Sequence, residues 1–317
     1  MEPAPFHSDI AGGPDGGAAY WLKTADGLRI RVGHWTIPDA KGTILIFPGR
    51  TEFIEKYGRA ARAFAERGYA SLAIDWRGQG IADRMMANRA IGHVGHFDDY
   101  QRDVEATLAH AAALDLPKPY FLIGHSMGGC IGLRSLMNGL DVNAAMFSAP
   151  MWGVQMNPAL RPVAWGLSAV SKPFGFDQTL APGQSEESYV LRTTLEENAL
   201  TGDAEMFDML QEQLAKHPDL GLGGPSLRWL NMSLREMFQL STLPSPAVPC
   251  LTFLGTDEAI VDPGRIRDRM RKWPGGQLRV IDGGRHEMLM DAPQMRTAII
   301  DETVALFDAN KTLTNAA

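Results

Sequence analysis

A serine flanked by glycines separates an apolar run from a helix-like run in "YFLIGHSMGGCIG", residues 120–132. Gly124, Ser126 and Gly128 form the pattern G-x-S-x-G, which between a strand and a helix indicates a sharp turn that exposes the serine hydroxyl. The glycines let the strand and the helix approach the strained serine without a clash. The stretch therefore predicts that Ser126 is a nucleophile for acyl transfer.

A serine hydroxyl is a weak nucleophile at neutral pH, so it needs a histidine that accepts its proton and a carboxylate that orients the histidine. His286 in "LRVIDGGRHEMLMD" follows a late strand-like run, after two glycines that permit a turn. Asp257 in "CLTFLGTDEAIVD" is the favoured carboxylate, because it directly follows a buried strand and precedes the histidine. Asp262 is the rival, although an aspartate before a proline is also typical of a helix cap.

The tetrahedral intermediate of acyl transfer carries an oxyanion that backbone amides must stabilise. One amide is expected from Met127, the residue after the nucleophile, at the positive end of the following helix. The second is expected from the loop "PGRTEF" after the run "TILIF", where Arg50 is the candidate. A plain turn remains the alternative interpretation of that loop.

The elements that must position these residues are buried strands with helices between them. Apolar runs recur along the chain, and amphipathic helical patterns such as residues 97–111 separate them. This alternation predicts an α/β fold with a mostly parallel sheet flanked by helices. A more polar run at 28–32 predicts an antiparallel strand at the start of the sheet. The expected parallel strands begin at Thr43, Tyr69, Tyr120, Ala144, Cys250 and Leu278.

The alternation stops between about residues 151 and 243, a gap too long for a loop. Two amphipathic helices are expected there, one around residues 206–214 and one around 230–238. We predict a helical lid at 151–243, inserted between a first core part, 1–150, and a second core part, 244–317.

Charge and composition exclude several classes of protein. Lysines and arginines number 30 against 37 aspartates and glutamates, giving a net charge of −7, which would repel nucleic acid. The beginning, "MEPAPFHSDIAGGPDGG", lacks the basic start and apolar run of a secretion signal, and no stretch of about 18 apolar residues follows. A cytoplasmic protein without a nucleic-acid partner is expected.

These motifs give the chain a resemblance to the α/β-hydrolase superfamily, and within it to serine lipases of the monoacylglycerol lipase and bacterial lysophospholipase type. The resemblance covers nearly the whole chain. It implies a triad of Ser126, Asp257 and His286, oxyanion amides from Arg50 and Met127, and no cofactor or metal. One departure is Pro-Gly at 48–49 where many members have His-Gly, a variant similar to the lysophospholipase branch. The matching segments are "FPGRTEFIEKY", "DWRGQGIADR", "GHSMGG", "GTDEAIVD" and "GGRHEM".

The expected function is hydrolysis of lipid-like carboxylic esters, lysophospholipids or monoacylglycerols, through an acyl-enzyme. Apolar lid residues would line a pocket for an acyl chain: Trp152, Trp165, Met206, Trp229, Met237 and Phe238. A short-chain carboxylesterase, an amino-terminal peptidase of the same fold and a non-catalytic ligand-binding protein remain alternatives. Peripheral contact of the lid with the inner membrane face also stays open, as does the oligomeric state.

Overall fold

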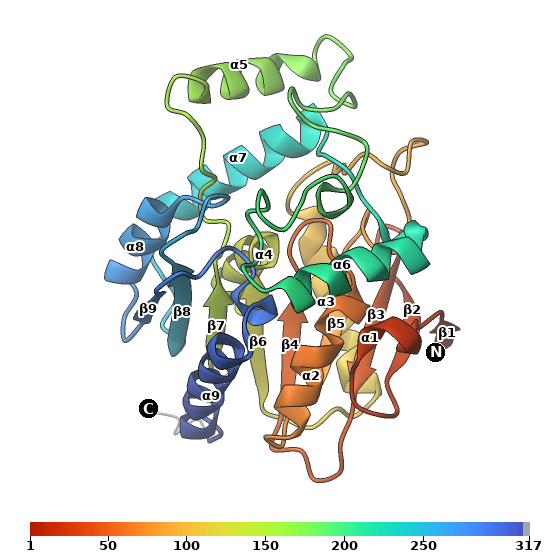
Figure 1. The fold of residues 1–317 in the computed structure, drawn as a ribbon, viewed down its shortest axis with the longest axis vertical. Helices are drawn as coiled ribbons and strands as arrows, with labels where there is room; N and C mark the ends of the chain where they lie inside the picture. Colours follow the sequence, from red (N-terminus) through yellow and green to blue (C-terminus); the bar gives the residue numbers. More distant parts are fainter. Residues whose placement is uncertain (313–317) are drawn as a thin grey trace.

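The computed structural model describes residues 1–312, which form one nine-stranded sheet with helices on both faces (Figure 1). The strand order is β1-β2-β3-β5-β4-β6-β7-β8-β9. The pairs β1/β2, β2/β3 and β3/β5 are antiparallel, and the remaining pairs are parallel. The strands are β1 (Glu2–Ala4), β2 (Ala18–Lys23), β3 (Arg29–Trp35), β4 (Thr43–Phe47), β5 (Ala70–Asp75), β6 (Tyr120–His125), β7 (Ala145–Ser148), β8 (Cys250–Gly255) and β9 (Gln277–Ile281).

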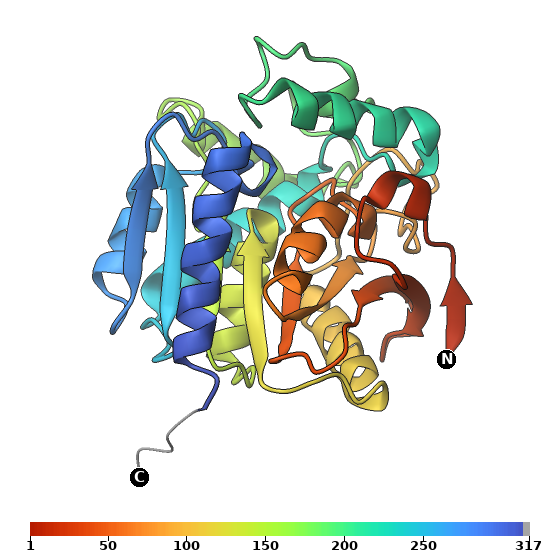
Figure 2. The same ribbon diagram turned by 60° about the horizontal axis from the view of Figure 1, so that its bottom comes forward.

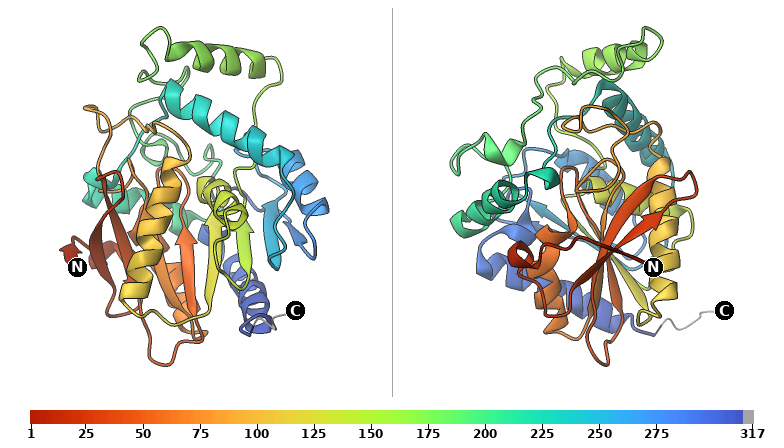
Figure 3. Two further views of the ribbon diagram at one scale, coloured as in Figure 1. Left: turned by 180° about the vertical axis from the view of Figure 1, so that it is seen from behind. Right: turned by 90° about the vertical axis from the view of Figure 1, so that its right-hand side faces the viewer.

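The central strands β4 to β8 are buried along their whole length, because helices cover both faces of a parallel sheet. Helices α2 (Gly58–Ala65) and α9 (Pro293–Ala309) lie on one face, and α3 (Asp99–Ala113) and α4 (Met127–Met137) lie on the other (Figures 1 and 3). The short elements η1 (Ile54–Tyr57), α1 (Ser8–Ala11) and η4 (Met288–Met290) and helix α8 (Pro263–Arg271) complete this part of the chain. Strands β1 and β9 form the opposite edges of the sheet (Figure 2).

Residues 149–249 connect the neighbouring strands β7 and β8, and we call this segment the insertion. Its helices stand beyond the carboxyl ends of the parallel strands, with α5 farthest from the sheet and packed on α7 (Figures 1 and 3). In open α/β sheets, this edge is where ligands bind. The insertion contains α5 (Arg161–Ser171), η2 (Tyr189–Leu191), α6 (Ala204–Lys216), η3 (Pro218–Leu220) and α7 (Leu227–Thr242).

The predicted fold class is confirmed, and each predicted strand is present to within about three residues at its ends. The last strand, β9, is wrongly predicted to be buried: it lies at the edge of the sheet and its residues are exposed or half-buried. The helical spacing at 230–238 predicts that Leu230, Leu234, Met237 and Phe238 share one packed face of α7, but Phe238 is 59% exposed. Helix α5 and strands β1 and β2 are not predicted from the sequence.

Candidate active site

The turn between β6 and α4 holds Ser126 in a conformation that residues with a side chain rarely adopt. Its φ is 49° and its ψ is −117°. The backbone is fixed there by its neighbours, since the carbonyl of Ser126 accepts hydrogen bonds from the amides of Gly129 (2.9 Å) and Met151 (2.8 Å). Such strain persists only where the surroundings impose it, and it is concentrated at functional sites.

Glycine at position 128 brings the start of α4 against the end of β4. A Cβ atom on Gly128 would overlap the carbonyl of Phe47 and lie 2.5 Å from the carbonyl oxygen of Pro48. The close approach places the loop after β4 beside the turn that carries Ser126. Position 128 of the motif therefore requires glycine, because any side chain there would overlap the backbone of β4.

A second pair of loops, after β8 and β9, brings a carboxylate to His286. The Nδ1–H of His286 donates to Oε2 of Glu258 at 2.8 Å, and both side chains are buried. The other oxygen, Oε1, accepts from the amides of Ile260 (2.6 Å) and Val261 (3.0 Å). The ring of His286 also lies 4.8 Å, centroid to centroid, from that of His125, the residue before Ser126.

The carboxylate at His286 is therefore Glu258, not the predicted Asp257. Asp257 is exposed, and its Oδ1 accepts from the hydroxyl of Thr256 at 3.1 Å. The chain turns after β8, so that consecutive side chains point in different directions and the second acidic residue faces inward. The rival Asp262 caps α8 by accepting the amides of Gly264 and Arg265. The sequence does offer one signal for Glu258, since this residue is acidic and directly follows Asp257.

The pKa of Glu258 is lowered. Burial opposes ionisation of this carboxyl, but the hydrogen bond and charge of His286 and the two backbone amides outweigh it. The carboxylate thus remains available to orient the imidazole at neutral pH.

The loop after β4 leaves one amide free between two that are occupied. The amide of Gly49 donates to the carboxylate of Glu52, and the amide of Thr51 donates to Oε1 of Gln79 at 3.1 Å. The side-chain nitrogen of Gln79 in turn donates to the carbonyl of Gly49 at 3.0 Å. Within residues 1–312, the amide of Arg50 has no acceptor. Glu52 and Gln79 hold this loop through hydrogen bonds that the sequence patterns did not reveal.

The amide of Met127 is the second free donor beside Ser126. It is the first residue of α4, and no acceptor for it exists in the described part of the chain. The first amides of a helix lack intrahelical partners and carry the positive end of the helix dipole. The two amides predicted to bind an oxyanion, from Arg50 and Met127, are thus both unoccupied.

A buried ionic cluster lies beneath these loops. Lys56 Nζ contacts Oε1 of Glu52 at 2.5 Å and Oε1 of Glu287 at 2.7 Å, and Tyr57 donates its hydroxyl to Glu52 at 2.6 Å. Nε2 of His125 lies 3.4 Å from Glu287 and 3.6 Å from Glu52. The cluster links the loop after β4 to the residue that follows His286.

The formal charges of this cluster balance when His125 is protonated. Burial alone would lower the pKa of His125, but Glu287 and Glu52 outweigh burial and raise it to about 9. Glu52, His125 and Glu287 could geometrically share a metal ion. The ammonium of Lys56 already bridges both carboxylates, so these residues do not fit a metal site.

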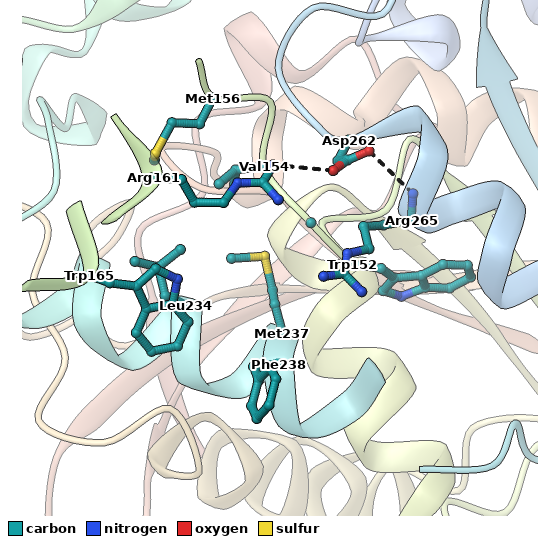
Figure 4. Close-up of a pocket in the computed structure, with 11 residues that line it drawn as sticks. Trp152, Val154, Met156, Arg161, Trp165, Leu234, Met237, Phe238, Asp262 and Arg265 are labelled. Carbon is teal, nitrogen blue, oxygen red and sulfur yellow. Dashed lines mark hydrogen bonds and ion pairs between the residues drawn. The ribbon is translucent and has the colours of Figure 1, made fainter. Parts of the chain in front are cut away.

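A pocket of about 100 Å³ lies between α5, α7 and the start of α8 (Figure 4). Trp152 is part of its lining, one residue after Met151, whose amide donates to the carbonyl of Ser126. Four of the six predicted pocket residues are in its wall, whereas Met206 and Trp229 are not. Arg161, Asp262 and Arg265 form a polar side. The apolar wall is made by Trp152, Val154, Met156, Trp165, Leu234, Met237 and Phe238.

Helices long and apolar enough to cross a lipid bilayer are absent from the described residues.

The sequence matches a family model described as serine aminopeptidase, S33, over residues 38–293. It is 27% identical to lysophospholipase L2 of Escherichia coli (strain K12) over 293 residues, covering 89% of this chain and 85% of that protein. It is 25% identical to probable lysophospholipase L2 of Haemophilus influenzae over 284 residues, covering 88% of each.

The fold is also similar to that of a solved structure, a soluble variant of monoglyceride lipase from Saccharomyces cerevisiae in complex with a substrate analogue. The TM-score is 0.71 at 20% sequence identity, and the likeness covers 92% of this chain and 95% of that chain. At this identity the comparison supports the arrangement of sheet and helices alone.

Proposed function

Because this chain belongs to the serine aminopeptidase S33 family of α/β-hydrolases, we propose that it hydrolyses carboxylic esters of lipid-like substrates through an acyl-enzyme on Ser126. The observation that carries the proposal is the strained serine beside two unoccupied amides. His286 is the proposed base, and Glu258 the acid that orients it. The order serine, acid, histidine along the chain is that of α/β-hydrolases, which use aspartate or glutamate as the acid.

In the proposed reaction, Ser126 Oγ attacks the ester carbonyl carbon while Nε2 of His286 takes the hydroxyl proton. The carbonyl oxygen becomes an oxyanion that the amides of Arg50 and Met127 stabilise. The carbon–oxygen bond to the alcohol then breaks, and His286 returns the proton to the leaving alkoxide. Water, deprotonated by the same imidazole, attacks the acyl-enzyme and releases the acid and free Ser126.

The substrate class is proposed from the relatives and from the pocket of Figure 4. The matched proteins are named lysophospholipase and monoglyceride lipase, and the pocket wall is largely apolar. The volume of about 100 Å³ is small for a long acyl chain, and side chains of α5 and α7 form much of the wall. We therefore propose that residues 151–243 act as a lid.

A substrate panel tests this function. We expect kcat/KM for long-chain lysophospholipids and monoacylglycerols to exceed that for short soluble esters by at least about ten-fold, because each buried methylene contributes about 0.8 kcal/mol. Hydrolysis is measured by release of the free acid, with the Ser126→Ala protein as the blank. A preference for short esters would make the chain a carboxylesterase instead.

An amino-terminal peptidase is the second candidate, favoured by the description of the family. Such an enzyme needs carboxylates that converge on a free amine. The acidic residues of the insertion do not converge: Asp203 caps α6, Glu205 pairs with Arg59, and most of the others are exposed. Aminoacyl amides belong in the same panel, and faster turnover of them would favour the peptidase. The exposed acidic residues are Glu186, Glu187, Glu196 and Glu197.

Peripheral contact with the inner membrane face is proposed for the outward side of α5. Val163 and Val170 of α5 and Phe174, three residues after its end, are 59%, 43% and 77% exposed, where a soluble domain normally presents polar residues. Residues 151–176 contain no acidic residue, and Lys172 is exposed, whereas Arg161 lines the pocket beside Asp262. An apolar surface next to an exposed lysine suits an anionic lipid interface.

Vesicle binding tests the contact. Replacing Val163 and Phe174 together by serine is expected to lower co-sedimentation with phosphatidylethanolamine–phosphatidylglycerol vesicles by about ten-fold or more, since burial of each side chain contributes roughly 1.5–3 kcal/mol. Leu191→Ser, which changes an exposed apolar residue outside α5, is the matched control. Equal binding by all three proteins would refute the contact.

A further inference from the structure

The side chain of Arg50 extends from the loop that carries the free amide toward the insertion. Its Nη1 donates to the carbonyl of Gly223 at 2.8 Å. Its guanidinium carbon lies 5.6 Å from the ring centroid of Trp229. Arg50 thus supplies its backbone amide at the proposed oxyanion site and places its guanidinium against the insertion, at Gly223 and Trp229.

The half-buried Arg50 has fewer partners for its guanidinium than Arg31 or Arg84 has. Arg31 contacts the carboxylates of Glu55 and Asp75, and Arg84, which also binds a carbonyl of the insertion, makes four hydrogen bonds. Within residues 1–312, Arg50 has no carboxylate within 4 Å and makes a single hydrogen bond. Removing a cation from water without a paired anion costs free energy. Binding of an anionic ligand would offset this cost.

The pKa of Arg50 follows from this environment. Burial lowers it to about 10, and the one opposing contribution, from Tyr100, does not restore the ordinary value. The group still carries its charge at neutral pH, and within residues 1–312 four of its five N–H bonds have no hydrogen-bond partner.

The span of the side chain matches that of a lysophospholipid. Five bonds separate the Cα of arginine from its guanidinium carbon, and six separate the ester carbonyl carbon of a 1-acyl lysophospholipid from its phosphorus. At roughly 1.2 Å of extension per bond, both distances are about 6–7 Å. A substrate whose carbonyl oxygen meets the amide of Arg50 can therefore place its phosphate at the guanidinium.

We propose that the guanidinium of Arg50 binds the phosphate of a lysophospholipid and thereby selects it over a neutral monoacylglycerol. Arginine suits this task because its planar donors match phosphate oxygens in a bidentate manner. The inference rests on the proposed ester hydrolysis and adds the headgroup that the same site prefers.

The test compares kcat/KM for a lysophospholipid and a monoacylglycerol with the same acyl chain, both below their micelle-forming concentrations. Arg50→Met is expected to lower the ratio of the two values by about 30-fold, the size of a lost charge-assisted hydrogen bond. Arg50→Lys should retain part of the preference, because the charge remains. Arg84→Met, which loses a similar contact between core and insertion, should leave the ratio unchanged.

Equal losses on both substrates in Arg50→Met would mean that Arg50 only fastens the insertion, and the headgroup inference would be wrong. An unchanged ratio would overturn it as well. Covalent labelling of each protein by a fluorophosphonate separates this failure from failure of the proposed function. A labelled enzyme with an unaltered ratio contradicts only the role of Arg50, whereas an unlabelled wild type contradicts the hydrolase.

Discussion

Exchanging Glu258 for glutamine is expected to lower kcat for ester hydrolysis by about 10³- to 10⁴-fold, as loss of the acid does in other serine triads. The amides of Ile260 and Val261 both bind Oε1 of Glu258. In the variant, they will hold the carboxamide oxygen and turn the NH2 group toward His286. The imidazole then accepts at Nδ1 and is protonated at Nε2, where it can no longer take the proton of Ser126.

Asp257→Asn is the matched control, because it makes the same chemical change one residue earlier on an exposed side chain. Its kcat should stay within about two-fold of wild type, as is usual for a surface substitution. Both proteins are assayed at one saturating substrate concentration after their melting temperatures have been compared. A large loss in Asp257→Asn together with a small loss in Glu258→Gln would return the role of acid to Asp257.

The lowered pKa of Glu258 determines how acidic the solution must become before the ion pair of Glu258 and His286 is lost. A carboxyl whose pKa is lower in the folded protein contributes stability that is present above its unfolded pKa, near 4.5, and is lost as the pH falls through the folded value. The pair therefore persists at neutral pH and is lost only in acid.

Ser126→Ala is expected to reduce kcat by about 10⁵- to 10⁶-fold, the loss measured when a triad nucleophile is removed. The residual rate would come from the amides of Arg50 and Met127, which the substitution leaves in place. Folding should be retained, because alanine adopts φ near 49° at a similar cost to serine. Labelling by a fluorophosphonate should disappear at the same time.

Ser135→Ala is the control for this experiment, since it removes a buried hydroxyl from α4, the helix that follows the turn. It should be labelled like wild type. If the folded wild-type protein is not labelled, the hydroxyl of Ser126 is not activated, and a non-catalytic ligand-binding protein becomes the better description.

The sequence was informative where a residue's position depends on a strong local pattern. The glycine-flanked serine occurs in one arrangement of strand, turn and helix, so the backbone of Ser126 could be predicted. His286 follows a recognisable strand. The choice between Asp257 and Glu258 depends on the direction of two side chains in a turn, which has neither the period of a strand nor that of a helix. Nothing in the spacing decides it.

Helix α5 escaped prediction for a related reason. Its outward positions carry valine, glycine and alanine, so apolar residues occur on the packed and the exposed face of the helix. The alternation of apolar and polar residues with a 3.6-residue period, which identifies an amphipathic helix, is therefore absent. Strand β9 was misjudged because an apolar run does not tell whether it lies at the centre or the edge of a sheet. Glu52 and Gln79 act through contacts between loops that are distant from the serine in sequence, and no local pattern reports them.

The insertion leaves and re-enters the core at adjoining points. Strands β7 and β8 pair directly, and Val154 bridges Val261 just beyond their ends. Because the core itself holds the two attachment points together, the entropy of closing the connection depends only weakly on its length. A change in the length of the insertion is therefore expected to cost the sheet that carries Ser126 little stability.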